Sequence, residues 1–207
     1  MLIETAAKIL EIPLIFDAYQ WAVRSPDSHR RFIDDYVRPL PGERILDVGC
    51  GTGACRRVLP ADVDYLGIDI NATYISHARM AYAGRGHFQV ADATSEGFRL
   101  DGHFDRAFAS GVLHHLPDSE VTALVRNVLG MLRPGGTFTA IDPCFMDGQH
   151  PFARFLARHD RGRYVRHVDR WIALIAPLGA AEFTVVHDML RVPYSQVITR
   201  ITAPEAV

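Results

Sequence analysis

The residues with the clearest chemical potential follow one short apolar run. Residues 49–54 read GCGTGA and fit the G-x-G-x-x-G/A pattern, in which glycines let a backbone loop approach a ligand closely. Asp47 stands two residues before the first glycine, and Asp69 follows Asp47 by 22 residues. An acidic residue about 20 positions after such a loop can accept hydrogen bonds from ribose hydroxyls. The pattern therefore predicts a ligand that carries a ribose.

Asp47 separates two kinds of ligand. A carboxylate at the mouth of the loop would repel the pyrophosphate of a nicotinamide dinucleotide. The same charge would attract the ammonium and sulfonium groups of S-adenosylmethionine. The carboxylate could also accept hydrogen bonds from backbone amides of the turn, and the two roles are compatible. The charge favours S-adenosylmethionine.

Length and composition limit the other possibilities. The chain has 207 residues, which suit a single domain over residues 1–207, and a formal net charge of −2, which argues against nucleic-acid binding by bulk charge. Cys50, Cys55 and Cys144 are an odd set without metal-site spacing, so we expect neither disulfides nor a metal site and favour a cytoplasmic setting. Charged residues interrupt the N-terminal apolar run, so we expect neither a signal peptide nor a transmembrane segment.

The apolar periodicity predicts an α/β fold that positions the acidic and glycine residues. Residues 1–42 form an N-terminal helical cap. Strands are expected at 44–48, 64–69, 87–91, 104–109 and 137–142. Helices at 53–59, 71–80 and 118–131 separate them, which is the rhythm of a parallel sheet with crossover helices.

The alternation stops after residue 142. Residues 143–167 are rich in Arg, His and Phe and are expected to form a lid or acceptor insert with some helix. Residues 168–207 then supply a last helix at 168–176 and two strands at 182–187 and 194–201, whose short connection favours an antiparallel hairpin.

Five motifs in order resemble the class I S-adenosylmethionine-dependent methyltransferases. They are ILDVGCGTG at 45–53, GIDIN at 67–71, VADAT at 90–94, FDRAFASGVLHHLPD at 104–118 and LRPGGTF at 132–138. The likeness is to the small-molecule type of domain (methyltransferase domain 11, 12 or 25). It implies a Rossmann-like three-layer sandwich with a seven-stranded, mostly parallel sheet and an antiparallel last hairpin. The ligand would lie across the carboxyl ends of the strands.

The resemblance also implies roles for single residues toward S-adenosylmethionine, whose product is S-adenosyl-L-homocysteine. Asp69 would bind the ribose, Ile70 would lie against the adenine, and Asp92 would meet the adenine amino group. The remaining implied contacts are Gly49, Cys50, Gly51 and Gly53 of the loop, the backbone of Ala93, and the carbonyls of Ser110 and Gly111 toward the methionine ammonium.

The N-terminal cap carries two further candidates. Tyr19 or Arg24 could meet the methionine carboxylate, an anion that otherwise lacks a partner. The alternative is a helix packed on the sheet with Arg24 in solvent. The sequence leaves both open.

His114 and His115 are the candidate catalytic residues. They follow the fourth strand, where the resemblance places the reactive methyl group, and either could act as a base or position the acceptor. A base is needed only if the acceptor must lose a proton. The Leu-His-His-Leu pattern also occurs in related enzymes that need none.

The insert bears on the acceptor. It and the following helix carry Arg154, Arg158, Arg161, Arg163, Arg166 and Arg170, interleaved with aromatic residues. If these arginines converge, they would suit an acidic or amphipathic small molecule; otherwise they form a solvated face.

Two other classes of function stay open beside methyl transfer to a small molecule. One is a methyltransferase-fold protein that binds the cofactor without transferring a methyl group. The other is an NAD-dependent oxidoreductase, which would need a catalytic pair such as Tyr and Lys, although Lys8 is the only lysine.

Overall fold

The computed structural model describes residues 27–160 and 162–205 of the chain. Helix α3 (Ser28–Arg31) continues into the wider π-type helix η1 (Phe32–Val37), which buries Phe32, Ile33 and Val37. Most of the predicted N-terminal cap lies outside the described residues. Among the residues that are described, no helix has both the length and the apolarity to cross a membrane.

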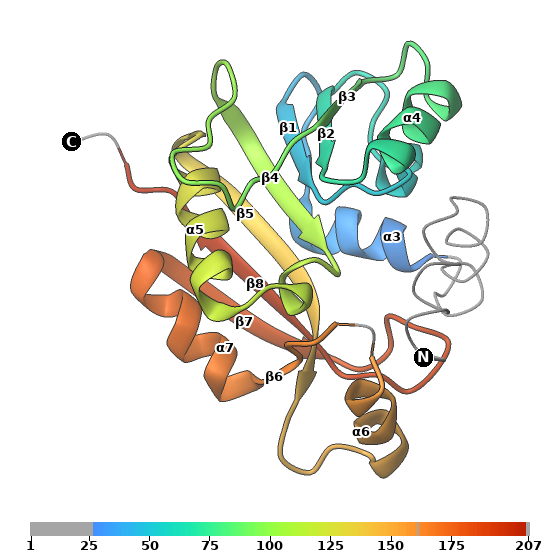
Figure 1. Ribbon diagram of the computed structural model, residues 1–207, viewed down its shortest axis with the longest axis vertical. Helices are drawn as coiled ribbons and strands as arrows, with labels where there is room; N and C mark the ends of the chain where they lie inside the picture. Colours follow the sequence, from blue (N-terminus) through green and yellow to red (C-terminus); the bar gives the residue numbers. More distant parts are fainter. Residues whose placement is uncertain (1–26, 161, 206–207) are drawn as a thin grey trace.

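A mixed sheet forms the middle layer, in the order β3-β2-β1-β4-β5-β8-β7 (Figure 1). Its strands are β1 (Arg44–Val48), β2 (Asp64–Asp69), β3 (His87–Val90), β4 (Phe104–Ser110), β5 (Leu132–Phe145), β7 (Ala180–Val186) and β8 (Gln196–Thr202). The strands from β3 to β5 run parallel, and β8 runs antiparallel to both of its neighbours. The predicted sheet and its antiparallel hairpin are confirmed. The two-residue strand β6 (Arg166–His167) adds an eighth strand beside the end of β5.

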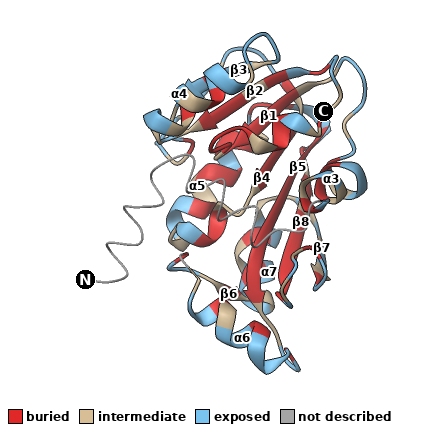
Figure 2. Cartoon of the chain, turned by 90° about the vertical axis from the view of Figure 1, so that its right-hand side faces the viewer, coloured by how far each residue is buried: buried red, intermediate tan, exposed pale blue. Residues whose placement is uncertain are grey.

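Helices cover both faces of the sheet, and each face has its own apolar core. Helices α5 (Asp118–Leu129) and α7 (Val168–Ile175) pack on one face, where Trp171 and Val125 are fully buried. The π-type helix and α4 (Ala72–Ala81) cover the other face with residues such as Ile33 and Ile75. The central strands β1, β4, β5 and β8 are mostly buried, whereas the edge strands β3 and β7 are more exposed (Figure 2). This is the predicted three-layer sandwich.

Strand order reverses between β1 and β4. Beginning at β1, the chain adds β2 and β3 on one side, whereas β4 and β5 lie on the other. The loops that leave β1 and β4 therefore diverge, and they open a crevice at the carboxyl edge of the sheet. The glycine loop follows β1 and the histidine pair follows β4, so the topology brings them to this crevice.

The helix predicted at 53–59 is much shorter in the structure. Only a 3₁₀ turn, η2 (Ala54–Arg57), forms there. The amides of Arg56 and Val58 donate to the carbonyls three residues back, and the buried side chain of Arg56 donates to the carbonyls of the segment that follows the turn. Pro60 disfavours a helical backbone at the residue before it and cannot donate an amide of its own.

The fifth strand begins five residues earlier than predicted, at Leu132 instead of residue 137. The segment Pro134-Gly135-Gly136 lies inside it. Leu132 pairs with Phe104, the register then shifts, and Gly135 adopts a positive φ of 72°. The strand is therefore irregular over these residues.

The insert is fixed to the core through a buried arginine. Helix α6 (Pro151–Arg158) begins with proline and is capped by His150, which accepts from the amide of Phe152. After it, Arg166 is buried and its Nε donates to Asp118 Oδ1 over 2.7 Å. The same guanidinium also donates to the backbone carbonyls of Leu113, Leu116 and Tyr164.

Replacing this arginine should destabilise the protein. Arg166→Met would remove the guanidinium together with its hydrogen bonds to three carbonyls and to Asp118 Oδ1, so we expect the free energy of unfolding to fall by about 3 kcal/mol. Denaturant unfolding followed by circular dichroism measures the change. Arg163→Met is the matched control, because Arg163 is exposed, and it should change the stability little. Equal stability of the two variants would contradict this account of the anchor.

Candidate active site

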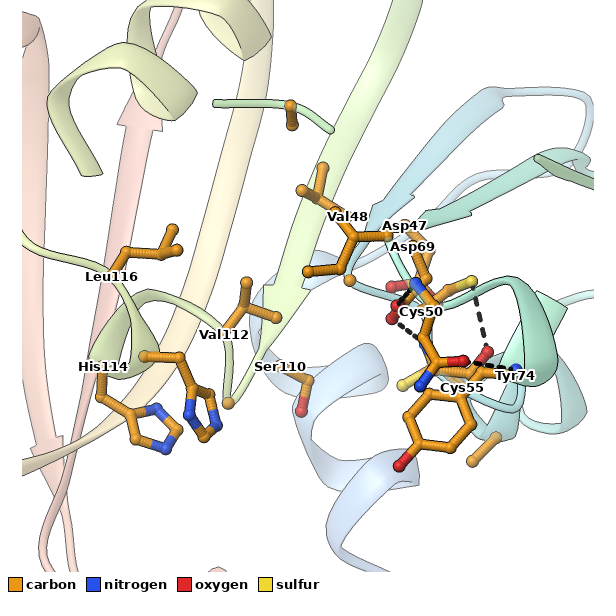
Figure 3. Close-up of a pocket in the computed structure, with 18 of the residues that line it drawn as sticks. Asp47, Val48, Cys50, Cys55, Asp69, Tyr74, Ser110, Val112, His114 and Leu116 are labelled. Carbon is orange, nitrogen blue, oxygen red and sulfur yellow. Dashed lines mark hydrogen bonds between the residues drawn. The ribbon is translucent and has the colours of Figure 1, made fainter. Parts of the chain in front are cut away.

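A cavity of about 740 Å³ opens at the carboxyl edge of the sheet. The glycine loop and the acidic residues lie on one side of it, His114 and Leu116 lie on the other, and Ser110 and Val112 lie between them (Figure 3). Among the predicted cofactor contacts, Asp47, Gly49, Cys50, Gly51, Asp69, Ile70, Asp92, Ala93, Ser110 and Gly111 line the cavity. Gly53 is not among the lining residues, and Tyr19 and Arg24 lie outside the described part of the chain.

The glycine loop has a backbone that other residues would not tolerate. Gly49, Gly51 and Gly53 have φ angles of 70°, 54° and 83°. A Cβ on Gly49 would lie 2.5 Å from Val112 Cγ2, and one on Gly53 would lie 2.9 Å from Phe88 Cε1. The glycines therefore allow both the turn and its close packing against the loop after β4 and the strand β3.

Asp69 is held rigidly at the end of β2. Its Oδ2 accepts from the amide of Gly51 over 2.9 Å, and its Oδ1 accepts from the amide of Asn71 over 2.8 Å. Burial raises the pKa of this carboxyl, and the two amide hydrogen bonds oppose the increase. Each oxygen keeps a further lone pair, so a ligand hydroxyl can still donate to it.

The residues expected near an adenine lie beside Asp69. Ile70 is 73% exposed and offers a flat apolar surface. Asp92 is exposed and accepts from the amide and hydroxyl of Thr94, which hold the pKa of this carboxyl below its usual value. The Ala93 carbonyl already accepts from the Asn127 amide group over 2.9 Å.

Asp47 is almost completely buried. Its Oδ2 accepts from the Tyr65 hydroxyl over 2.8 Å, whereas the amides of Gly49 and Cys50 donate to the Ile68 carbonyl. Burial raises the pKa of Asp47 to about 7, despite the opposing hydrogen bond from Tyr65. A carboxylate in this state gains much from a cation beside it, since burial is what disfavours its charge.

The hydrogen bond from Tyr65 depends on a glycine in the neighbouring strand. Gly67 pairs with Asp47 in the β1–β2 register. A Cβ on Gly67 would lie 2.8 Å from the Tyr65 hydroxyl oxygen and 2.9 Å from Cys50 Sγ. The glycine of the GIDIN motif thus leaves room for the tyrosine to reach the acid.

His114 lies buried between two carboxylates. Its Nδ1 is 2.8 Å from Asp142 Oδ1, and its Nε2 is 3.2 Å from Asp160 Oδ1. The backbone amide of His114 also donates to Asp142 Oδ1 over 3.0 Å. Asp142 lies in β5, whereas Asp160 lies in the insert.

These contacts set the charge of the imidazole. Burial alone would lower the pKa of His114, but the hydrogen bonds and charges of Asp142 and Asp160 outweigh it and raise the pKa from 6.5 to about 9. For Asp160 burial acts in the opposite direction and would raise the pKa, but the contacts with His114 and the Tyr194 hydroxyl lower it to about 2. At neutral pH this arrangement is an imidazolium between two carboxylates.

His115 differs from His114 in its burial. It is exposed, lines the cavity and stacks on His114 with ring centroids 4.1 Å apart. The two histidines predicted as alternatives are therefore not equivalent: one is buried and held by carboxylates, and the other is exposed.

The segments after β5 contribute both apolar and polar residues to the cavity. Its lining includes Pro143, Leu156, Leu190 and Val192, beside the polar side chains of His159, Asp160 and Tyr194. Gln196 also lines it; this side chain is 9% exposed, and its Oε1 is buried without a hydrogen-bond partner. A buried amide oxygen of this kind gains a donor when a ligand supplies one.

The arginines of the insert do not converge on the cavity. None of those that the structure describes is among its lining residues, and Arg166 and Arg170 bind Asp118 instead. The expectation that they would recognise an acidic acceptor finds no support in this geometry.

Several residues of the site escaped the sequence analysis. They are Tyr65, Asp142, Asp160, Tyr194 and Gln196. Asp142 ends a predicted strand beside the cavity, and this position could have marked it. The others lie in a strand interior or in aperiodic segments, where no local pattern signals a contact across the fold.

Comparison with known proteins finds methyltransferases among the proteins that this chain resembles. A family model described as a methyltransferase domain matches residues 45–136. The O-methyltransferase cnsE of Penicillium expansum is 39% identical over 140 residues, which are 64% of this chain and 49% of that protein. The aklanonic acid methyltransferase DauC of Streptomyces sp. (strain C5) is 37% identical over 131 residues, 59% and 58% of the two chains. This chain spans about half the length of the first curated relatives it matches.

Solved structures share the fold. The N-methyltransferase NodS from Bradyrhizobium japonicum WM9, in complex with S-adenosyl-L-homocysteine, has a TM-score of 0.67 at 17% identity, with 86% of this chain and 87% of that chain covered. The [4+2]-cyclase SpnF has a TM-score of 0.69 at 19% identity, with 86% and 81% covered. The family match, the sheet order and these neighbours agree: residues 45–136 match a methyltransferase domain, and the chain shares the fold of the solved methyltransferases.

Proposed function

We propose that the protein transfers a methyl group from S-adenosylmethionine to a hydroxyl oxygen of a small, largely apolar molecule. One observation carries the choice of oxygen: His114, oriented by Asp142, faces the cavity opposite the glycine loop. A hydroxyl must lose its proton when it is methylated, and a histidine oriented by a carboxylate can accept that proton once its Nε2 is unprotonated. The O-methyltransferases among the relatives support the same chemistry.

The residues of the glycine side fit this cofactor. The positive φ angles of its glycines let the loop turn tightly beside the cavity, and Asp69 is fixed with lone pairs left for ribose hydroxyls. We assign Ile70, Asp92 and Ala93 to the adenine. Gly49, Cys50, Gly51 and Gly53 shape the loop. When bound, the cofactor supplies a methyl group on a sulfonium, which is already activated for displacement.

The methionine ammonium is assigned to Asp47 and to the carbonyls of Ser110 and Gly111. Asp47 is buried with a raised pKa, so an adjacent cation would stabilise its ionised form. Tyr19 and Arg24 stay candidates for the methionine carboxylate. The charges of the cavity support a cationic group at this position, because Asp69 adds a second negative charge nearby.

We assign the acceptor to the part of the cavity that is lined by the insert and by the segment before β8. Leu156, Leu190 and Val192 favour a molecule with apolar surface, and Gln196 favours one that also carries a hydrogen-bond donor. With no described arginine in the lining, the geometry favours a neutral acceptor over an acidic one.

Methyl transfer can be tested directly. The purified protein, incubated with S-adenosylmethionine and a panel of phenols and aliphatic alcohols, should form S-adenosyl-L-homocysteine and a methyl ether with at least one member, as detected by mass spectrometry. Asp69→Ala should abolish turnover and weaken cofactor binding, because it removes the ribose acceptor. Tight cofactor binding without methyl consumption across hydroxyl and amine panels would favour a protein that only binds the cofactor.

Cofactor affinity should depend on the ionisation of Asp47. Because a cation binds the carboxylate and not the acid, we expect the affinity for S-adenosyl-L-homocysteine to fall as the pH decreases through about 7 and to level off above it. Calorimetric titration between pH 5.5 and 8 measures this. Methylthioadenosine lacks the amino-acid part, so its affinity should change little over the same range.

A variant sharpens this measurement. Tyr65→Phe removes the hydrogen bond that lowers the pKa of Asp47, so the midpoint of the affinity profile should move to higher pH. If S-adenosyl-L-homocysteine and methylthioadenosine showed the same pH profile of affinity, the assignment of the ammonium to Asp47 would be contradicted.

Gln196 should affect the acceptor more than the cofactor. Gln196→Leu keeps the size of the side chain but removes its polar group, so we expect the KM for a hydroxylated acceptor to rise about tenfold, equivalent to one lost hydrogen bond. The Kd for S-adenosylmethionine should stay unchanged. A change in cofactor affinity with an unchanged acceptor KM would contradict this assignment.

A further inference from the structure

Both ring nitrogens of His114 are occupied in this structure. Asp142 holds Nδ1 at 2.8 Å from within the sheet, and Asp160 holds Nε2 at 3.2 Å from the insert. An imidazole in this state has no lone pair with which to accept a proton. The nitrogen that an acceptor hydroxyl would have to reach is covered by the Asp160 carboxylate, which also lines the cavity.

The two carboxylates are held in different ways. Asp142 is buried and belongs to β5, which pairs with neighbours on both sides. Asp160 is only partly buried, and it is fixed by the Tyr194 hydroxyl at 2.5 Å and the Gly162 amide at 2.7 Å. One partner is thus part of the sheet, and the other is part of a loop.

The loop docks on His114 mainly through its backbone. The Tyr164 amide donates to the His114 carbonyl over 3.0 Å. A Cβ on Gly162 would lie 1.9 Å from His114 Cδ2 and 2.7 Å from the His114 carbonyl oxygen, so only glycine permits this approach. Asp160 is therefore delivered to Nε2 by a segment whose packing requires contact with this histidine.

We propose that Asp160 is a positioning residue that occupies Nε2 of His114 until the hydroxyl of the acceptor takes its place. The proposal rests on the proposed O-methyl transfer. While Asp160 is in contact, His114 stays protonated; when the carboxylate is displaced, the imidazolium loses one of its two partners and releases its proton to solvent. Asp142 then orients a neutral ring whose Nε2 faces the acceptor.

The proton and electron changes of the transfer follow from this arrangement. The acceptor oxygen forms the new O–C bond, and the C–S bond breaks with its electron pair left on sulfur. The hydroxyl proton passes to Nε2 of His114. The positive charge thus moves from sulfur to the imidazolium, which Asp142 stabilises and Asp160 can contact again.

Several charged groups surround the imidazole and contribute to its titration. Asp142 and Asp160 raise its pKa, and the neighbouring ring of His115 lies against it. The groups one step further out are Tyr194, through Asp160, and Arg166, through the Leu113 carbonyl. A test must therefore change Asp160 while leaving the others in place.

The test follows the titration of His114 by NMR in protein without acceptor. The imidazole signal of His114, identified by its loss in His114→Gln, should titrate near pH 9 in the wild type. In Asp160→Asn the midpoint should fall by about 1–3 pH units, because one charged partner is lost. Asp160→Glu, which restores the carboxylate, should return the midpoint toward that of the wild type.

Asp169→Asn is the matched control. Asp169 is an exposed acid 3.2 Å from the ring of another histidine, His167, and its replacement should leave the titration of His114 unchanged. An unchanged His114 midpoint in folded Asp160→Asn, judged by its circular dichroism spectrum, would overturn the proposal.

Kinetics provide the second readout. With a hydroxylated acceptor, Asp160→Asn should extend the kcat/KM profile to lower pH, because its His114 is neutral there. An acid limb at the same pH as in the wild type would also overturn the proposal. The titration needs no turnover, so a protein that shows the expected shift in midpoint but methylates no hydroxyl would contradict the proposed function and not the role of Asp160 toward His114.

Discussion

A carboxylate removed from water needs a partner, and the cavity is surrounded by four of them. Asp69 receives two backbone amides, and Asp142 and Asp160 share the imidazolium of His114. Asp47 receives only the neutral hydroxyl of Tyr65, and its pKa is raised because this hydrogen bond does not offset the effect of burial. The acid with the weakest partner therefore marks where the site can best accommodate a cation, and the other three are already satisfied by the protein.

The reversal of strand order allows these acids to meet. Asp47 and Asp69 end or precede the ends of strands on one side of the reversal, whereas Asp142 lies on the other. The glycine loop and Asp69 thus come from one half of the sheet, His114 and Asp142 come from the other, and the divergent loops lie between them. The insert and the segment before β8 add both apolar and polar residues to the cavity.

Local sequence patterns were enough to predict most of the strands and part of the candidate site. The strands and the glycine loop were predictable because their apolar alternation and turn residues act over a few positions, and Asp69 follows the loop at a regular distance. The helix after Gly53 is shorter than predicted: the chain forms only a 3₁₀ turn, and Pro60 disfavours a helical backbone just before it. The contact of Asp160 with His114 joins residues 46 positions apart in the sequence, in a segment without periodicity, so no local signal announced it.

Gly162 has a consequence for how substrate preference and chemistry can vary separately. Apart from the Asp160 carboxylate, the loop touches His114 through a backbone amide and a residue without a side chain. Its docking therefore does not depend on Leu156, the side chain that α6 contributes to the cavity lining. A different residue at position 156 would change the shape of the cavity and leave the contacts of His114 as they are.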